Sequence, residues 1–181
     1  MKLRRITTSD AKEYTFVEGL LTEAFPSDEY RDLGQMREYT DSNDRFSVYL
    51  IIDSDEYAGF ITIWNFEGFI YVEHFAILPS MRNRQLGSRV LAYVDAMVNK
   101  SVVLEVEEPE DDLTRRRIGF YQRNGFELLP EEYSQPAYRA DSASLPMRIM
   151  VKEKSAKNLS MNSIKAALYK HVYGVDDEQA C

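Results

Sequence analysis

The hydrophobic pattern changes its period several times along the chain, and each change predicts a different kind of element. After a short opening strand, KLRRIT, apolar residues three and four positions apart predict a helix with one buried side, and Pro26 ends it. The buried side carries Tyr14, Val17, Leu20, Leu21 and Phe25. A second, more polar helix is expected to begin near Ser27.

Three segments rich in aromatic and β-branched residues follow these helices. They are RFSVYLIID, YAGFITIWNF and FIYVEHFAIL, and short turns between them predict three consecutive antiparallel strands. Helices and strands then alternate: a helix over 86–99, the apolar strand SVVLEVEEP, a helix within DDLTRRRIGFYQRNG with a short strand after it, and the strand LPMRIMVKE. The segment 130–144 is expected to be an irregular loop. An amphipathic helix over 160–174 is expected to dock on the domain or on a second copy of the chain.

This order of elements predicts a mixed α+β fold. A meander of strands followed by alternating strands and helices implies a mixed central sheet of about seven strands with helices on both faces. The length of 181 residues suits one domain with a proper core. We expect that domain to span residues 1–152 and a C-terminal helical extension to span 153–181.

Charge and composition narrow the range of partners. The formal net charge of -8 disfavours nucleic acid and mildly favours a cationic partner, although acidity often serves solubility alone. No apolar run approaches the roughly 20 residues that span a bilayer. No signal peptide is recognisable either, so we expect a cytoplasmic protein without a membrane partner. Two histidines and the single Cys181 make a metal site unexpected and an intrachain disulfide impossible.

The segment SMRNRQLGS, which leads into the helix over 86–99, has the composition of an anion-binding helix start. Successive N–H groups at such a start bind phosphate with the help of the helix dipole, and Arg82, Arg84 and Arg89 add positive charge. The alternative is that the arginines are only solvated and that Gly87 allows close packing. Short glycine motifs often have no functional meaning.

Two motifs together resemble the acetyl-CoA-binding region of the GNAT acetyltransferase superfamily. In YVEHFAILPSMRNRQLGSRVL, a strand leads into a turn that is similar to the family's Arg/Gln-x-x-Gly-x-Gly/Ala. About 30 residues on, RRIGFYQRNGFELL resembles a later helix with a tyrosine and a terminal Gly-Phe. The resemblance implies the GNAT fold and direct transfer of acetyl from acetyl-CoA to a primary amine of a small molecule or peptide. It is also compatible with a homodimer.

The resemblance assigns cofactor-binding residues as well. The backbone of Phe75, Ala76 and Ile77 would hold the pantetheine arm, and the turn would hold the pyrophosphate through Arg82, Asn83, Arg84, Gln85, Leu86, Gly87 and Ser88. Gln85 departs from the family, which usually has a glycine that allows a positive φ. Either Gln85 is held in a tolerated conformation, or the loop binds CoA more weakly. The second option leaves a non-catalytic acyl-CoA-binding regulatory module as an alternative function.

Acetyl transfer to an amine needs one group that accepts a proton and one that donates a proton to the departing thiolate. Tyr121 aligns with the family's acid, although it could equally be a helix tyrosine that packs on the sheet. Glu73, an acidic residue in an apolar strand, is the leading candidate for the base. A nearby Glu105 would raise the pKa of one of the two carboxyls. The alternatives are that either carboxylate orders water, binds a cationic substrate or pairs with an arginine.

For Thr114 and His74, a purely structural role has to be considered beside a functional one. Thr114 stands where the family often has an asparagine that contacts the CoA arm, and helix packing would explain it equally well. His74 alternates to the opposite face from Glu73, so we expect a packed or hydrogen-bonded structural histidine.

Overall fold

The computed structural model describes residues 1–139, 142–154 and 159–175 of the chain. Cys181 and the segments 155–158 and 176–181 of the expected extension lie outside the described residues. The chain forms two compact units, of which the first consists of Met1–Asn65 and Val72–Val98, and the second of Phe66–Tyr71 and Asn99–Cys181. The described part of the extension belongs to the second unit.

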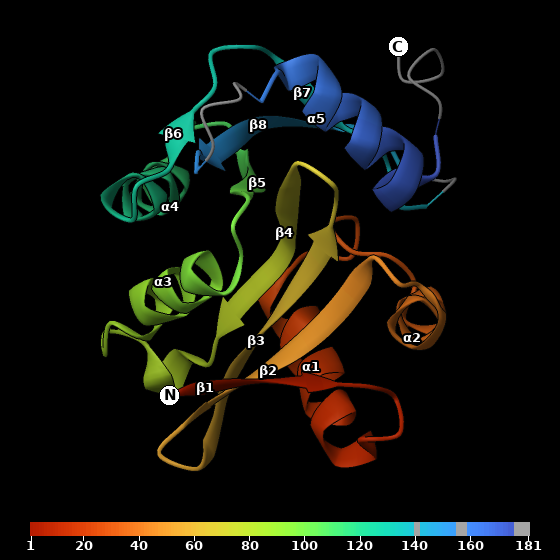
Figure 1. Ribbon diagram of the computed structural model, residues 1–181, viewed down its shortest axis with the longest axis vertical. Coiled ribbons are helices and arrows are strands. Elements are labelled where there is room, and N and C mark those ends of the chain that lie inside the picture. The colour runs from red at the N-terminus through yellow and green to blue at the C-terminus, as the bar shows by residue number, and fades with distance from the viewer. Residues whose placement is uncertain (140–141, 155–158, 176–181) are drawn as a thin grey trace. The chain divides into compact units, whose positions relative to one another are not determined.

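The first unit is built on an antiparallel meander of strands (Figure 1). β1 (Lys2–Ile6) pairs with β2 (Phe46–Asp53), and β2 pairs with β3 (Glu56–Asn65). β3 lies beside β4 (Phe69–Ile77). The three consecutive strands predicted from the aromatic and β-branched segments are confirmed.

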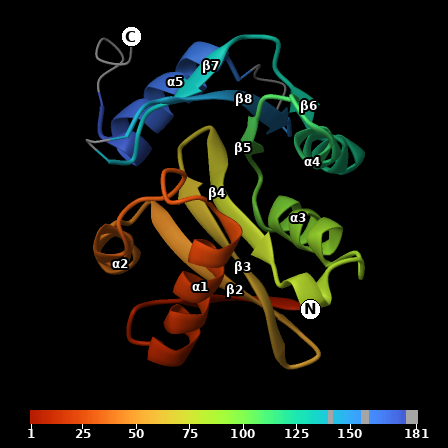
Figure 2. The same cartoon turned by 180° about the vertical axis from the view of Figure 1, so that it is seen from behind.

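Helices α1 (Ala11–Ala24), α2 (Leu33–Ser42) and α3 (Leu86–Met97) complete this unit. α1 covers one face of the meander: it lies behind the strands in Figure 1 and in front of them in Figure 2. It buries Tyr14, Val17, Leu20 and Leu21, as predicted.

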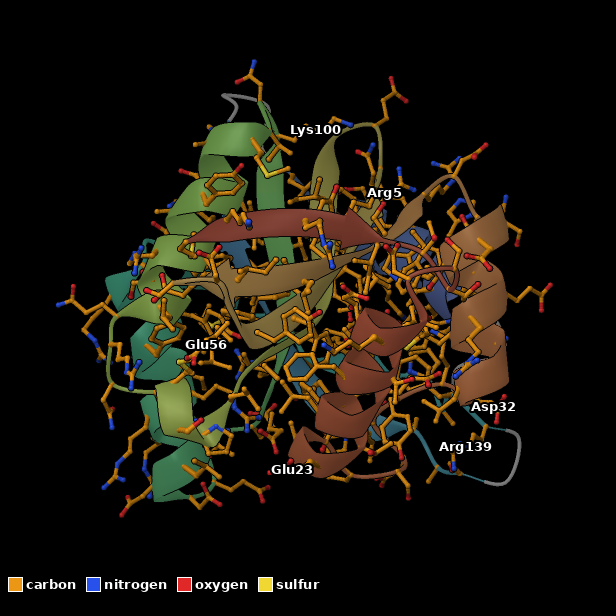
Figure 3. The ribbon with its side chains drawn as sticks, turned by 90° about the horizontal axis from the view of Figure 1, so that it is seen from below. Arg5, Glu23, Asp32, Glu56, Lys100 and Arg139 are labelled. Atoms are coloured by element: carbon orange, nitrogen blue, oxygen red, sulfur yellow. The ribbon has the colours of Figure 1, made fainter. Side chains whose placement is uncertain are left out.

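The predicted start of α2 near Ser27 is wrong. The helix begins at Leu33 because the Asp32 side chain accepts hydrogen bonds from the N–H groups of Gly34 and Gln35, at 2.8 and 3.3 Å. Figure 3 labels Asp32 at this end of the helix. The segment before it, 26–32, consists of turns and bends, and it carries residues that matter below.

The second unit is organised around β8 (Leu145–Lys152), which pairs antiparallel with three strands. These are β5 (Ser101–Glu107), β6 (Glu127–Leu128) and β7 (Tyr133–Gln135). β7 lies inside the predicted irregular loop 130–144, since a strand of three residues is too short to leave a readable pattern. The described residues therefore contain eight strands where about seven were expected. The mixed α+β class is confirmed.

Two helices belong to this unit. α4 (Asp112–Arg123) is followed by Gly125, whose φ of 86° is the left-handed conformation expected of a glycine after a helix end. α5 (Met161–Leu168) continues as a π-helix over Tyr169–Tyr173. Of the two docking options for this helix, the structure has it on its own chain. The Tyr169 hydroxyl donates a 2.6 Å hydrogen bond to the Ser134 carbonyl in β7, and α5 lies across β7 and β8 in Figures 1 and 2.

Candidate functional site

The turn between β4 and α3 contains two non-glycine residues with left-handed backbone conformations. Asn83 has a φ of 63°, and Gln85, the N-cap residue of α3, has φ 58° and ψ 12°. The Gln85 carbonyl accepts the first hydrogen bond of the helix, from the Arg89 N–H at 3.1 Å. Gln85 is thus held in the tolerated conformation, with the backbone that a glycine would adopt. For an L-residue other than glycine, this conformation costs about 1 kcal/mol or more relative to the right-handed one.

The N-terminus of α3 has no side-chain cap within the described residues, as is also the case for α1. Asp32, Asp111 and Ser160, in contrast, cap α2, α4 and α5. The first N–H groups of a helix have no partner within the helix. In α3 these groups belong to Leu86, Gly87 and Ser88, and the left-handed residue just before them is typical of a backbone concavity that binds anions.

The cations around this turn are not equivalent. Arg82 donates to the Ile77 carbonyl at 3.2 Å, and Arg84 lies 3.4 Å from the sulfur of Met81. Both arginines are exposed. Arg89, in contrast, forms an ion pair with Asp53 at 3.3 Å. Arg82 and Arg84 are therefore better placed than Arg89 to meet an anion at the turn.

The end of β4 approaches β3 unusually closely. The main-chain oxygen of Ala76 lies 2.1 Å from the position that a β-carbon on Gly59 would occupy, which only glycine permits. All peptide bonds of the described chain are trans, so the N–H of Ile77 points away from the Ala76 oxygen and hence away from Gly59. The Ile77 amide therefore has a fixed direction. It belongs to the segment of Phe75, Ala76 and Ile77 that is expected to bind the pantetheine arm.

Glu73, the expected base, is the anion of a buried ion pair. Its side chain is 1% exposed and accepts a short hydrogen bond from Arg31, whose side chain is 3% exposed. The Trp64 indole donates to the other carboxylate oxygen at 3.1 Å. Burial alone would raise the pKa of Glu73, but Arg31 and the neighbouring His74 outweigh it and hold the pKa below its usual value. The expected rise of this pKa toward the range of a general base is wrong for Glu73, because its charge partner is an arginine.

Arg31 was not identified from the sequence. It lies in the 26–32 segment, where its guanidinium sits over the rings of Tyr39 and Trp64, at 4.8 and 5.3 Å from their centroids. The only signal for it was the carboxylate in an apolar strand, which requires a buried cation somewhere in the chain.

His74 has the structural role that was predicted. It is buried, its main-chain N–H donates to the Thr62 hydroxyl at 2.9 Å, and its ring nitrogen lies 3.0 Å from the Glu29 carbonyl. Glu73 and His74 together hold the 26–32 segment against β4.

Tyr121 lies on α4 between two other aromatic rings. The centroids of Phe120 and Phe126 are 5.2 and 5.6 Å from its own. Burial raises the pKa of Tyr121 to about 12, so its hydroxyl keeps the proton at neutral pH. A phenol in this state is able to act as a proton donor, and the rings explain its packing equally well. The acid role of Tyr121 stays a prediction.

Thr114 is engaged within its own helix. Its hydroxyl and the Asp111 carboxylate form a capping box, in which the Thr114 N–H donates to Asp111 at 2.8 Å and the Asp111 N–H donates to the hydroxyl at 3.1 Å. The hydroxyl of Thr114 thus has a role within α4, and its contact with CoA stays a prediction.

Glu105, which was expected near Glu73, accepts hydrogen bonds from tyrosines. Three hydroxyls donate to its carboxylate: Tyr71 at 3.0 Å, Tyr173 at 2.7 Å and Tyr133 at 2.5 Å. These tyrosines come from β4, the π-helix and β7, and nothing in their spacing along the sequence predicted that they would meet.

Within the described ranges, no helix is long and apolar enough to cross a membrane. No three His, Cys, Asp or Glu side chains there are grouped so that they would hold a metal ion.

Comparisons with known proteins agree with the resemblance seen in the sequence. A family model described as an acetyltransferase (GNAT) domain matches residues 44–128. A search of curated proteins finds no match. Among solved structures, a GNAT-family protein from Bacteroides thetaiotaomicron is 43% identical, with a TM-score of 0.92. That match covers 97% of this chain and 100% of the other.

More distant structures share the fold alone. An aminoglycoside 6'-N-acetyltransferase in complex with coenzyme A is 17% identical, with a TM-score of 0.62. The match covers 88% of this chain and 100% of that one. A spermidine N-acetyltransferase mutant from Vibrio cholerae is 15% identical, with a TM-score of 0.62. Here the match covers 86% of this chain and 96% of that one.

Proposed function

The chain belongs to the GNAT family of acetyltransferases, and from that premise we propose that it transfers the acetyl group of acetyl-CoA directly to a primary amine. The observation that carries the proposal is the left-handed backbone of Gln85 at the uncapped start of α3. This geometry supports the proposal because Gln85 has a backbone conformation that a glycine readily adopts. The named acceptors of the distant structures, aminoglycosides and spermidine, are amines too.

Cosubstrate binding in this proposal relies mainly on backbone groups. The N–H groups of Leu86, Gly87 and Ser88 bind the pyrophosphate, with Arg82 and Arg84 supplying charge. The pantetheine arm lies along the end of β4. The Ile77 N–H, which points away from Gly59, is a suitable donor to the thioester carbonyl oxygen, where negative charge develops during transfer.

The chemistry is a direct acyl transfer. The neutral amine attacks the thioester carbonyl carbon, a C–N bond forms, the C–S bond breaks, and the CoA thiolate leaves. The nitrogen, which is cationic after the attack, releases its extra proton to solvent water, and solvent in turn restores the proton that Tyr121 gives to the thiolate. The Tyr121 hydroxyl donates a proton to that thiolate, for which its protonated state at neutral pH is suited. Glu73 has a structural role in this proposal, because its carboxylate is committed to Arg31 and Trp64.

The alternative of a non-catalytic regulatory module has lost its main support. That support was the departure at Gln85, and the residue takes up the conformation of the glycine that it replaces. We therefore retain the transferase as the proposed function and the regulatory module as an outcome of its test.

The test is calorimetry with acetyl-CoA, followed by a free-thiol release assay over a panel of primary amines. We expect binding and amine-dependent thiol release. Arg84→Gln should weaken acetyl-CoA binding about tenfold, because it removes a charge-assisted contact. Arg116→Gln, which removes the same charge from an exposed position on α4, is the matched control. Absence of binding at millimolar acetyl-CoA would contradict the proposal. Binding without turnover of any amine would favour the regulatory module.

A further inference from the structure

The first unit contains a pocket that the proposed acetyl transfer does not use. This α2 pocket lies where α2 ends and the chain enters β2, beside the end of β3, and its volume of about 590 Å³ is typical of small-molecule sites. Its lining is mostly polar and consists of Tyr39, Ser42, Asn43, Asp44, Arg45 and Asn65. All six residues belong to the first unit.

The turn that carries Asp44 and Arg45 is held in place from both sides. The side-chain oxygen of Asn43 accepts a 3.0 Å hydrogen bond from the Arg45 N–H, and its carbonyl accepts one of 3.0 Å from the Phe46 N–H. The Asn65 N–H donates to the Arg45 carbonyl at 2.8 Å. The backbone of the turn is therefore fixed at the pocket.

The two charged side chains of the pocket have no partners in the part of the chain that the structure describes. The Asp44 carboxylate and the Arg45 guanidinium form neither a hydrogen bond nor an ion pair there, with each other or with any other group. Both side chains are exposed. Each charge can therefore meet a ligand without breaking an existing contact.

The end of α2 adds a preference for a cation. The carbonyl end of a helix carries a partial negative charge, and the last turn of α2 contains no basic residue that would neutralise it. Asp44 follows shortly after Ser42, the last residue of this helix. The helix end and Asp44 thus both favour an ammonium group, while the Arg45 guanidinium favours a carboxylate.

We propose that the α2 pocket binds a zwitterion, with its ammonium group at Asp44 and its carboxylate at Arg45. This is the chemistry of a free α-amino acid or of a short peptide with both ends free. The ammonium keeps its proton beside a carboxylate, so it is not the nitrogen that attacks acetyl-CoA. The inference goes beyond the proposed function, and because its tests contain no acetyl-CoA, either can fail without the other.

Tyr39 connects the pocket to a natural reporter. Its ring lies 5.6 Å from that of Trp64, centroid to centroid, with the two planes nearly perpendicular. Trp64 is the only tryptophan of the chain. A ligand that contacts Tyr39 should therefore change the fluorescence of Trp64.

The first test uses the wild-type protein alone. Calorimetry and Trp64 fluorescence rank serine, asparagine and glutamine, each free and as a dipeptide with glycine, which distinguishes an amino acid from a peptide. The best ligand is then compared with its N-acetyl derivative, which lacks the ammonium, and with its C-terminal amide, which lacks the carboxylate. We expect it to bind about fivefold more tightly than either derivative, as one partly exposed charge pair contributes. Equal affinities for the three compounds would overturn the proposal, as would an absence of binding across the series at millimolar concentration.

The second test removes each charge in turn. Arg45→Gln should lower the affinity for the zwitterion about fivefold and leave that for the amide unchanged, because the amide has no carboxylate to lose. Asp44→Asn should lower the affinity for the zwitterion and leave that for the N-acetyl derivative unchanged. The controls are Arg5→Gln, at a position labelled in Figure 3, and Asp28→Asn, both exposed in the same unit. Controls that lower the affinity as much as the pocket variants would overturn the proposal. If a pocket variant does not fold, the wild-type comparison decides.

Discussion

The main-chain oxygen of Ala76 occupies the space in which residue 59 would carry a β-carbon, and Gly59 is the residue that leaves this space open. The distance of 2.1 Å is far below any real contact of a β-carbon, and the obstacle is backbone, which cannot swing aside as a side chain would. The direction of the peptide between Ala76 and Ile77 therefore depends on Gly59, although Gly59 itself belongs to β3.

We predict that Gly59→Ala displaces the end of β4. The added methyl group should cost about 1–3 kcal/mol of unfolding free energy, as overpacking does. It should also weaken acetyl-CoA binding. Urea unfolding and calorimetry measure the two effects. Gly19→Ala in α1 is the control, because nothing lies within 4 Å of its β-carbon and alanine favours a helix. Unchanged stability and affinity in Gly59→Ala would show that the Ala76 carbonyl is placed differently.

At Gln85, two substitutions should separate backbone conformation from side-chain chemistry. Gln85→Gly removes the cost of a positive φ, so this variant should retain both its stability and its affinity for acetyl-CoA. Gln85→Val should lower the free energy of unfolding by about 1–2 kcal/mol and bind acetyl-CoA more weakly. Thermal unfolding and calorimetry on the two variants provide the comparison. If valine were as well tolerated as glycine, the left-handed conformation would have no role in binding.

The pair of Glu73 and Arg31 should behave as a structural unit. Glu73→Gln leaves the buried guanidinium of Arg31 without its anion. This change should lower the free energy of unfolding by about 3–5 kcal/mol. The double substitution Glu73→Leu with Arg31→Met should recover most of that loss. It should also retain acetyl transfer, since neither residue is assigned to the chemistry. Glu67→Gln, at an exposed position, is the control for charge. A stable double variant without activity would instead support Glu73 as the base.

Acidification should act on the same pair. The pKa of Glu73 in the folded protein lies below the ordinary value of a glutamate, about 4.5, so the unfolded chain takes up the proton first as the pH falls. The stabilisation is complete above about pH 4.5 and is lost as the pH drops through the lowered pKa. Urea midpoints at pH 7 and pH 3 should therefore fall further for the wild type than for the double variant. An equal fall in both proteins would contradict the ion pair.

Tyr121→Phe should separate cosubstrate binding from chemistry. Acetyl-CoA affinity should stay nearly the same, while turnover falls about 100-fold through loss of the proton donor. Tyr93→Phe, on the exposed side of α3, is the control. Unchanged turnover in Tyr121→Phe would leave the residue only its packing role.

Alkaline titration gives an independent check on Tyr121. The pKa of Tyr121 in the folded protein, about 12, lies above the ordinary tyrosine value of 10.0, so its contribution to stability is complete below pH 10 and is lost as the pH rises through 12. The pKa of Tyr14 is also raised to about 12, so the phenolate absorbance change near pH 12 should be smaller in Tyr121→Phe than in the wild type by the contribution of one tyrosine. A difference near pH 10 in its place would mean that the ring is not buried.

Local patterns were enough to predict much of the fold. The period of apolar residues gave α1 and its buried side, and the aromatic and β-branched runs gave β2, β3 and β4. The start of α2 could not be read in the same way, because several acidic and serine residues near it were equally good caps. Only the structure shows that Asp32 is the one used. β7 was missed because three residues are too few to show a period.

The candidate site was predictable where it depends on backbone and unpredictable where it depends on distant side chains. The turn around Gln85 follows directly on β4, so the motif and its place at a helix start could be read together. The partners of Glu73 and Glu105 could not, because Arg31 lies 42 residues from Glu73 and Tyr173 lies 68 residues from Glu105. No periodicity reports a contact over such a separation.

The separation between Glu105 and Tyr173 also bears on how the protein is made. A ribosome that has just added Glu105 has yet to add the 68 residues that lead to Tyr173. Until they emerge, the carboxylate lacks one of its hydroxyl donors and must stay hydrated. The second unit therefore cannot reach its final state during synthesis of its own strands, and its closure waits for the helix that follows them.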